Sequence, residues 1–361
     1  MNMPAHISND AHALRQSWRE VIADKPMRNR DAAEFLGVTE LELIASLVGE
    51  NRGDSATRLA PHWVQILQRV QSLGRVMALT RNDAAVHERR GVYQNISVTG
   101  HMGLALGEDI DLRLFFAQWA HGYAVEEIAA DGVTKRSLQF FDAAGGAVHK
   151  IFLQHESDAG EFEMLVEQFR ADMQTPGQTV RPRAPAKAEA DDSTINVDAF
   201  RASWADLKDT HEFFGLLKQH GVTRSQAMRL ADNEFATRVH ATSARHMLET
   251  AAAAQTNIMC FVGNVGCIQI HTGPVANIKV MGPWLNVLDE AFNLHLREDM
   301  IREAWVVKKP TTEGLVTSLE LFDSKGDTIA QFFGKRKPGI PELPQWREII
   351  AGIPAQAVAL L

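Results

Sequence analysis

The stretch SLQFFDAAGGAVHKIF at residues 137–152 decides the fold, because SLELFDSKGDTIAQFF at residues 318–333 repeats its pattern. In both stretches, two segments rich in apolar residues flank a short segment that contains glycine. This arrangement is typical of two antiparallel strands joined by a tight turn, so each stretch predicts a β-hairpin. The recurrence of one hairpin in the two halves of a 361-residue chain indicates a duplication.

Further blocks recur upstream of the two hairpins and in the same order. Residues 36–47, 76–91 and 111–114 correspond to residues 220–231, 258–273 and 293–296. A single match of this kind arises easily by chance, whereas an ordered series at nearly constant spacing does not. The sequence therefore predicts an α+β fold with a tandem structural duplication, in which each repeat is a large antiparallel β-sheet with flanking helices.

The segment QTPGQTVRPRAPAKAEADDST, residues 174–194, differs from the rest of the chain. It is rich in proline, alanine and charged residues and lacks any hydrophobic periodicity. Such a composition is typical of a connection between domains. We expect an N-terminal repeat at residues 1–173, a linker at 174–197, and a C-terminal repeat at 198–361 that carries the functional site.

The composition is that of an ordinary globular protein, with 45% hydrophobic and 23% charged residues. The sequence contains no run of about 18 apolar residues, and its N-terminal stretch lacks the layout of a signal peptide. Cys260 and Cys267 are too few for a disulfide framework. We expect a cytoplasmic protein that does not insert into membranes, and the net charge of −8 argues against a nucleic-acid partner.

Two segments have the outline of a helix-turn-helix, at residues 31–47 and 211–230. In the first, the helix that would enter DNA carries Glu40 and Glu42 and has no lysine or arginine to meet phosphates. DNA binding is therefore a remote alternative to a plain pair of helices at the edge of a domain.

Among the 14 histidines, His211 has the most specific surroundings. Asp209 or Thr210 is suited to cap a helix, which would leave His211 in the first turn. Phe213 and Phe214 follow and supply an apolar wall. An imidazole beside such a wall suits a flat apolar ligand with a metal at its centre, although a surface or a structural role fits the same residues.

Residues 111–119, 210–224, 258–275 and 303–323 together resemble the cytoplasmic haem-degrading or haem-trafficking factors of bacterial haem-uptake systems, the hemin-degrading factors. The resemblance extends over nearly the whole chain and includes the duplication. It implies two tandem repeats and a haem cofactor beside the C-terminal one. In this family a histidine of a T-H-x-F-F motif binds the iron, and that motif falls on His211.

The resemblance implies further haem contacts. The arginine of a D-L-R-L-F motif, on the open side of the iron and with a catalytic role, falls on Arg113. Leu112 and Leu114 would face the other side of its strand. Partners of the haem propionates fall on Arg224, Lys309, Gln331 and Arg336. Phe333 stands where family members carry tyrosine, which puts one hydroxyl contact in doubt.

Two functions follow from the resemblance. In the first, the protein carries intact haem to a downstream haem oxygenase. In the alternative, it is itself a haem-degrading monooxygenase that releases iron. The sequence contains no recognisable flavin or nicotinamide motif, so that enzyme would need an external reductase as its electron donor. This absence favours the carrier, and the enzymatic activity stays open.

Overall fold

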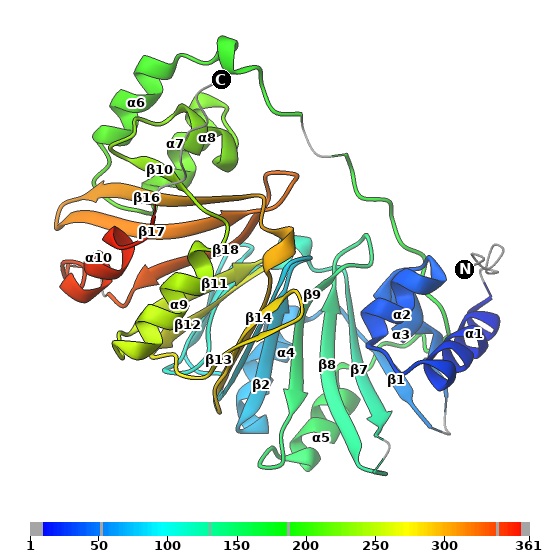
Figure 1. Cartoon of the computed structure of the whole chain (residues 1–361). Helices are drawn as coiled ribbons and strands as arrows, with labels where there is room; N and C mark the ends of the chain where they lie inside the picture. Colours follow the sequence, from blue (N-terminus) through cyan, green and yellow to red (C-terminus); the bar gives the residue numbers. More distant parts are fainter. Residues whose placement is uncertain (1–9, 51–52, 130, 186–187, 337–338, 355–361) are drawn as a thin grey trace. The chain divides into compact units, whose positions relative to one another are not determined.

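The computed structural model describes residues 10–50, 53–129, 131–185, 188–336 and 339–354 (Figure 1). The chain divides into two compact units. The first unit comprises residues 1–80, 89–185 and 264–268, and the second comprises residues 81–88, 186–263 and 269–361. None of the described helices has the length and apolar character required for a membrane span.

The same succession of helices and strands occurs on both sides of the predicted linker. The first half contains α1 (Ala11–Asp24), α2 (Asn29–Leu36), α3 (Glu40–Ser46), β1 (Ser55–Leu59), α4 (Trp63–Val70), β2 (Val76–Arg81), β3 (Ala85–Gly91), β4 (Ile96–Thr99), β5 (Met102–Leu106), β6 (Asp111–Phe115), β7 (His121–Ile128), β8 (Thr134–Phe141), β9 (Ala147–Leu153) and α5 (Ala159–Phe169). The second half contains α6 (Val197–Ala205), α7 (Glu212–His220), α8 (Arg224–Leu230), β10 (Ala236–Val239), α9 (Ser243–Ala253), β11 (Ile258–Gly263), β12 (Cys267–Gly273), β13 (Ile278–Met281), β14 (Trp284–Leu288), β15 (Phe292–Arg297), β16 (Glu303–Thr311), β17 (Gly314–Phe322), β18 (Thr328–Gly334) and α10 (Pro344–Ala351).

The strands form two nine-stranded antiparallel sheets. Their orders are β1-β7-β8-β9-β2-β3-β15-β14-β13 and β10-β16-β17-β18-β11-β12-β6-β5-β4. The prediction of an α+β fold with a tandem duplication is confirmed. Each sheet contains strands from both halves of the chain, which the sequence pattern did not predict.

Both predicted hairpins are present, as β8–β9 and β17–β18, and they share their turn chemistry. Asp142 Oδ1 accepts the backbone N–H groups of residues 144 and 146, and Asp323 Oδ1 accepts those of residues 325 and 327. Gly145 and Gly326 have φ values of +84° and +81°. A Cβ on Gly145 would lie 2.4 Å from the Thr39 hydroxyl, and one on Gly326 would lie 2.5 Å from a serine hydroxyl. Glycine is required at both turns for its backbone freedom and its lack of a side chain.

The predicted linker is attached at both ends. The Arg58 guanidinium donates hydrogen bonds to the carbonyl oxygens of Thr175 and Gly177, at 3.1 and 2.8 Å. At the other end, Arg229 forms an ion pair of 2.6 Å with Glu189. From residue 178 onward, the described residues of this segment form no helix or strand before a short 3-10 turn at Asp192–Thr194. The division into repeats at residues 174–197 stays a prediction, and these contacts show that the segment is not a free tether.

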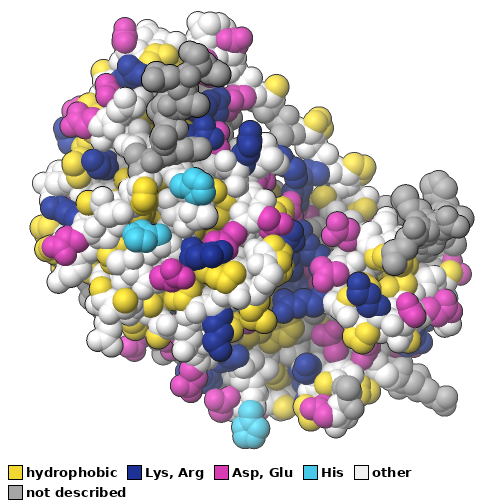
Figure 2. All heavy atoms as spheres, viewed as in Figure 1, with side chains coloured by type: hydrophobic (Ala, Val, Ile, Leu, Met, Phe, Trp, Pro, Cys, Tyr) yellow, Lys and Arg dark blue, Asp and Glu magenta, His cyan; other side chains and the backbone are white. Residues whose placement is uncertain are grey.

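Charged side chains of both signs are interspersed over the surface in view (Figure 2). This mixture agrees with the total of 45 acidic and 37 basic residues in the chain.

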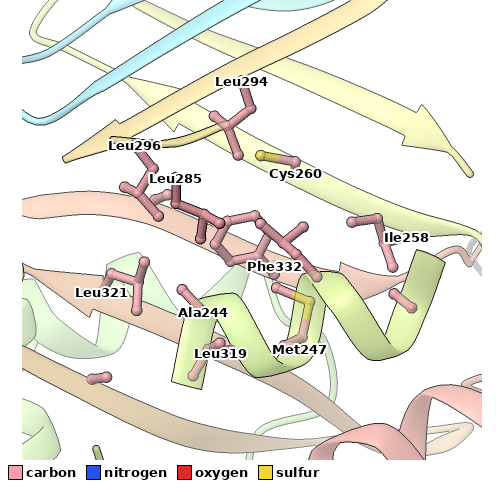
Figure 3. Close-up of a cluster of buried hydrophobic side chains, with 14 of the residues drawn as sticks. Ala244, Met247, Ile258, Cys260, Leu285, Leu294, Leu296, Leu319, Leu321 and Phe332 are labelled. Carbon is pink, nitrogen blue, oxygen red and sulfur yellow. The ribbon is translucent and has the colours of Figure 1, made fainter. Parts of the chain in front are cut away.

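The largest core cluster of the second unit lies under α9 (Figure 3). Ala244 and Met247 extend from this helix toward Phe332 on β18. Buried residues of neighbouring strands complete the cluster, among them Ile258, Cys260, Leu285, Leu294, Leu296, Leu319 and Leu321. A core of this size fixes β17 and β18 as a rigid support, and residues on the other face of these strands form the candidate site.

Candidate functional site

His211 lies immediately before the first residue of α7 and projects into solvent, with 87% of its side chain exposed. Its Nδ1 lies 2.6 Å from Asp209 Oδ1, which also accepts the His211 backbone N–H at 2.8 Å. The backbone N–H and then the ring of His211 hold the pKa of Asp209 below its usual value. Because Nδ1 is engaged by this carboxylate, Nε2 is the nitrogen left to bind a ligand.

The start of α7 differs from the expected cap. Neither Asp209 nor Thr210 is the N-cap residue, since His211 occupies that position with helical backbone angles. Asp209 stabilises the turn before the helix instead, and Glu212 Oε2 accepts the backbone N–H groups of Lys208 and Asp209, at 2.9 and 3.2 Å. The Asp209 carboxylate bonds to the backbone that follows it and the Glu212 carboxylate bonds to the backbone that precedes it, so the backbone around His211 has a defined conformation.

The two phenylalanines after His211 have opposite environments. Phe213 is 1% exposed and packs edge-on against Trp204, with 4.6 Å between ring centroids. Phe214 is 75% exposed. Residues three apart share one face of a helix, so Phe214 lies on the same side as His211. Of the predicted apolar wall, only Phe214 is available to a ligand, because Phe213 belongs to the core beneath it.

Next to Phe213 lies a cluster of three charged side chains, which we call the cation cluster: partly exposed Arg224 and buried Lys309 and Glu320. Arg224 donates Nε to Glu320 Oε2 at 2.7 Å and Nη2 to Oε1 at 2.9 Å, and Lys309 Nζ donates to Oε1 at 2.7 Å. Both cations also lie over the Phe213 ring, 5.1 Å and 4.6 Å from its centroid. These contacts hold the two cations side by side.

The cation cluster carries an excess positive charge. Glu320 is 0% exposed, and burial alone would raise its pKa, but Arg224 and Lys309 outweigh burial and hold the pKa well below its usual range. Burial lowers the pKa of Lys309 to about 8, with Glu320 opposing and Arg224 reinforcing this shift. Two cations therefore share one carboxylate, and a second carboxylate from a ligand would complete the charge balance.

Two further predicted residues belong to the same unit. Gln331 on β18 is paired directly with Glu320 on β17, so both side chains leave the same face of the sheet. Arg336 follows β18, and its positive charge acts on Asp209. Phe333 lies with its ring centroid 6.0 Å from Lys309 Nζ and packs edge-on against Phe261. The second unit thus contains His211 and all four predicted propionate contacts.

Arg113 belongs to the first unit and lies on β6. Its neighbours Leu112 and Leu114 are buried while Arg113 is about one-third exposed, as the strand alternation predicts. Arg113 forms an ion pair with Asp111. Burial raises the pKa of Asp111 more than Arg113 lowers it. The assignment of Arg113 to the open side of a haem iron stays a prediction.

The first repeat has a different set of charges at the corresponding positions. The hairpin registers equate Gln139 with Glu320 and Lys150 with Gln331. Glu40 follows a Thr39 capping box, just as Arg224 follows one at Thr223. Lys150 Nζ lies 2.6 Å from Glu40 Oε1, and both side chains are nearly buried. This pair is electrically neutral, so the first repeat lacks the excess cation of the second.

Glu320 is a residue of the candidate site that the sequence analysis missed. It is buried, it touches both predicted cations, and Ser318 donates a further hydrogen bond to it at 2.9 Å. The signal was present in the two hairpin sequences, where glutamate replaces the glutamine of the first copy. A carboxylate on a buried strand face requires a cation beside it, and that requirement would have singled it out.

The two helices of the DNA-binding alternative are packed into the protein. In α3, five of seven residues are buried, and the same holds for α8. Helices buried to this extent cannot enter a DNA groove. These positions argue against DNA binding through either helix-turn-helix outline.

Within the described residues, no group of three or more histidine, cysteine, aspartate or glutamate side chains could hold a metal ion. A metal at His211 would therefore depend on further ligands supplied from outside the protein. A metalloporphyrin supplies four of them.

Comparison with known protein families identifies the chain. The haemin-degrading HemS/ChuX domain matches it twice, at residues 37–169 and 221–353. The chain belongs to this family. The predicted family resemblance is confirmed, and the two matches agree with the duplication seen in the order of the elements.

Individual relatives match nearly the whole chain. The hemin transport protein HmuS of Yersinia pestis is 40% identical over 344 residues, which cover 94% of this chain and 96% of that protein. The crystal structure of holo-PhuS, a heme-binding protein from Pseudomonas aeruginosa, has a TM-score of 0.92 at 48% identity and covers 96% of this chain and 100% of its own. ChuS, described as an E. coli heme oxygenase, has a TM-score of 0.83 at 37% identity and covers 94% and 99% of the two chains.

Proposed function

We propose that this protein binds haem on its second unit and carries it intact, in the cytoplasm, to a downstream haem oxygenase. The observation that carries the proposal is the combination of an exposed imidazole, with Nε2 open, and the cation cluster with its excess positive charge. Haem-binding and hemin transport proteins among the relatives support it.

The residues fit the three chemical needs of haem. Iron requires an axial ligand, and the neutral imidazole of His211 is a common one. The porphyrin plane requires an apolar contact, which exposed Phe214 offers on the same helix face. The two carboxylates require cations or hydrogen-bond donors, for which we assign Arg224, Lys309, Gln331 and Arg336.

Bound haem would supply the redox and oxygen chemistry of its iron. The chain's own residues bind and orient it. His211 would hold the iron at the start of α7, and Lys309 and Arg224 would bind a carboxylate with little movement, because Glu320 and Phe213 already hold both cations. A single axial ligand at an exposed position also allows release, as a carrier needs.

A second function, haem degradation by this protein, is favoured by the similarity to ChuS, described as a heme oxygenase. In that function Arg113 would be the catalytic residue, and an external reductase would supply electrons. The two functions differ in the fate of the porphyrin, which remains intact in a carrier and is opened in an oxygenase.

Single-turnover measurements distinguish them. Protein loaded with one haem is mixed with a reductase, its electron source, oxygen and catalase, and the absorption spectrum is followed. In parallel, loaded protein is mixed with apomyoglobin as a haem acceptor. Transfer to apomyoglobin with no ring-opened product in the presence of catalase supports the carrier. Ring opening that persists with catalase establishes the oxygenase and excludes a role limited to carriage.

A further inference from the structure

We propose that Asp209 is a positioning residue that directs Nε2 of His211 toward the iron and makes the imidazole favour ferric over ferrous haem. This inference rests on the proposed function, since it takes His211 as the axial ligand. It extends that function by assigning a preferred oxidation state to the cargo.

The first support is the geometry of the turn. Asp209 Oδ1 lies 2.6 Å from the ring Nδ1 and 2.8 Å from the backbone nitrogen of His211, so one oxygen holds both the ring and its main chain. Glu212 in turn holds the backbone of Asp209. An exposed histidine without such contacts would sample several rotamers, whereas this one is oriented before any ligand arrives.

The second support is the chemistry of a carboxylate–imidazole hydrogen bond. When Nδ1–H donates to a carboxylate, the tautomer is fixed, the lone pair is on Nε2 and electron density on the ring increases. A more strongly donating imidazole stabilises the higher charge of ferric iron more than the lower charge of ferrous iron. Asp209 would therefore bias the site toward the oxidised form.

Solvent decides the strength of this effect. In the free protein the pair is exposed, 87% for the His211 side chain and 59% for that of Asp209, and water competes for both partners. Arg336 also acts on the same carboxylate. A porphyrin lying on Nε2 and over Phe214 would displace water from the pair, and a hydrogen bond in a drier environment is stronger.

The test compares Asp209→Ala and Asp209→Asn with wild type, all loaded with haem. Asp206→Ala is the matched control, because it removes an exposed carboxylate of the same turn that pairs with Lys208 rather than with His211. The readouts are the iron reduction potential and, in the ferrous five-coordinate form, the iron–histidine stretching frequency by resonance Raman spectroscopy. Thermal unfolding checks that each variant is folded.

In Asp209→Ala we expect the ferric preference to fall about tenfold, which is a rise of about 59 mV in the one-electron potential, together with a lower stretching frequency. Asp209→Asn keeps a hydrogen-bond acceptor without the charge and should give an intermediate value. Asp206→Ala should match wild type.

A potential and a stretching frequency in folded Asp209→Ala equal to those of wild type would overturn the inference. His211→Ala separates that outcome from a failure of the proposed site. If His211→Ala abolishes the iron–histidine band while Asp209→Ala leaves it unchanged, the site stands and only the role of Asp209 is wrong. If His211→Ala retains the wild-type band, the ligand assignment itself fails.

Discussion

Lys309 and Glu320 form a buried ion pair on neighbouring strands, with 2.7 Å between Nζ and Oε1 and almost no exposure of either side chain. Neither residue could stay charged alone in this environment, because an isolated buried charge is costly. The pair keeps Lys309 positively charged inside the protein, where its attraction for an anionic ligand is weakly screened.

Glu320→Gln removes the only negative charge of the cation cluster. Buried Lys309 would then lie beside Arg224 with no counter-charge, and we expect a loss of about 3–5 kcal/mol in the free energy of unfolding. Urea denaturation measures it. The control Glu313→Gln alters a half-buried residue in the turn between β16 and β17, outside the cation cluster, and should leave stability nearly unchanged. A Glu320→Gln protein as stable as wild type would show that Arg224 and Lys309 do not need the Glu320 carboxylate as a counter-charge.

His211→Ala should weaken haem binding and shift the ferric Soret band, because the iron loses its axial protein ligand. Replacement by His87 is not expected, since His87 is completely buried on β3 against Phe292. Haem titration followed by absorbance measures both effects, with His240→Ala as the control at another exposed histidine. An unchanged spectrum and affinity in His211→Ala would refute the ligand assignment.

Phe213 and Phe214 provide a matched pair of variants. Phe214→Ala should leave the free energy of unfolding within about 0.5 kcal/mol of wild type and weaken haem binding about tenfold, through loss of an apolar contact. Phe213→Ala should cost about 3–5 kcal/mol of stability, because it opens a cavity under the two cations. The prediction fails if Phe214→Ala binds haem as tightly as wild type.

The pKa of Lys309, lowered by burial to about 8, predicts a pH dependence of binding. Above this pH the free protein has a neutral Lys309, so binding of a haem carboxylate must be accompanied by the uptake of a proton from solvent at Lys309. We expect affinity to be level between about pH 7 and 8 and to fall by up to about tenfold per unit above it. Lys309→Arg stays charged throughout and should remove the fall. A fall that persists in Lys309→Arg would place the titrating group elsewhere.

The lowered pKa of Lys309 has the opposite effect on the stability of the folded protein, which should increase with pH. Between about pH 8 and the ordinary lysine value of 10.5, the unfolded chain holds a proton at Lys309 that the folded protein has lost. This group alone therefore makes the free energy of unfolding rise with pH across that window. Urea denaturation of wild type and Lys309→Arg at the two ends of the window measures this contribution.

Arg113→Ala should leave haem bound, since His211 and the cation cluster remain. A guanidinium near the open side of the iron would favour the alkaline, anionic form of the ferric complex, so its removal should raise the pH of the acid–alkaline spectral transition. A spectrophotometric titration measures the shift, with Arg136→Ala as a control at another partly exposed ion pair. Identical titration curves for wild type and Arg113→Ala would show that Arg113 does not lie near the iron.

The hairpins and the duplication were predictable because they depend on local patterns. Alternation of apolar residues and a required glycine specify β8–β9 and β17–β18 from a few neighbouring residues each. The assignment of strands to sheets was not predictable, because periodicity identifies a strand but not its partner. The exchange of β4–β6 and β13–β15 between the two sheets therefore appears only in the structure.

The candidate site was predictable in part, and by a different route. His211 and the propionate contacts came from a family resemblance, since a lone histidine at a helix start has several possible roles. The alternation at Leu112, Arg113 and Leu114 followed from strand geometry. The sequence suggested Asp209 as a helix cap, because sequence alone does not show whether a carboxylate bonds to a backbone group or to a neighbouring ring.

The neutral pair Lys150–Glu40 has a consequence for how the two repeats diverged. Conversion of the first repeat to the charge set of the second requires changes at the positions of Glu40, Gln139 and Lys150, and also at Glu127, which the strand registers equate with Lys309. A change at Glu40, Gln139 or Lys150 alone would leave an unbalanced, nearly buried charge and destabilise the protein. The two copies are therefore separated by an epistatic barrier: single substitutions do not readily convert the charge set of one repeat into that of the other.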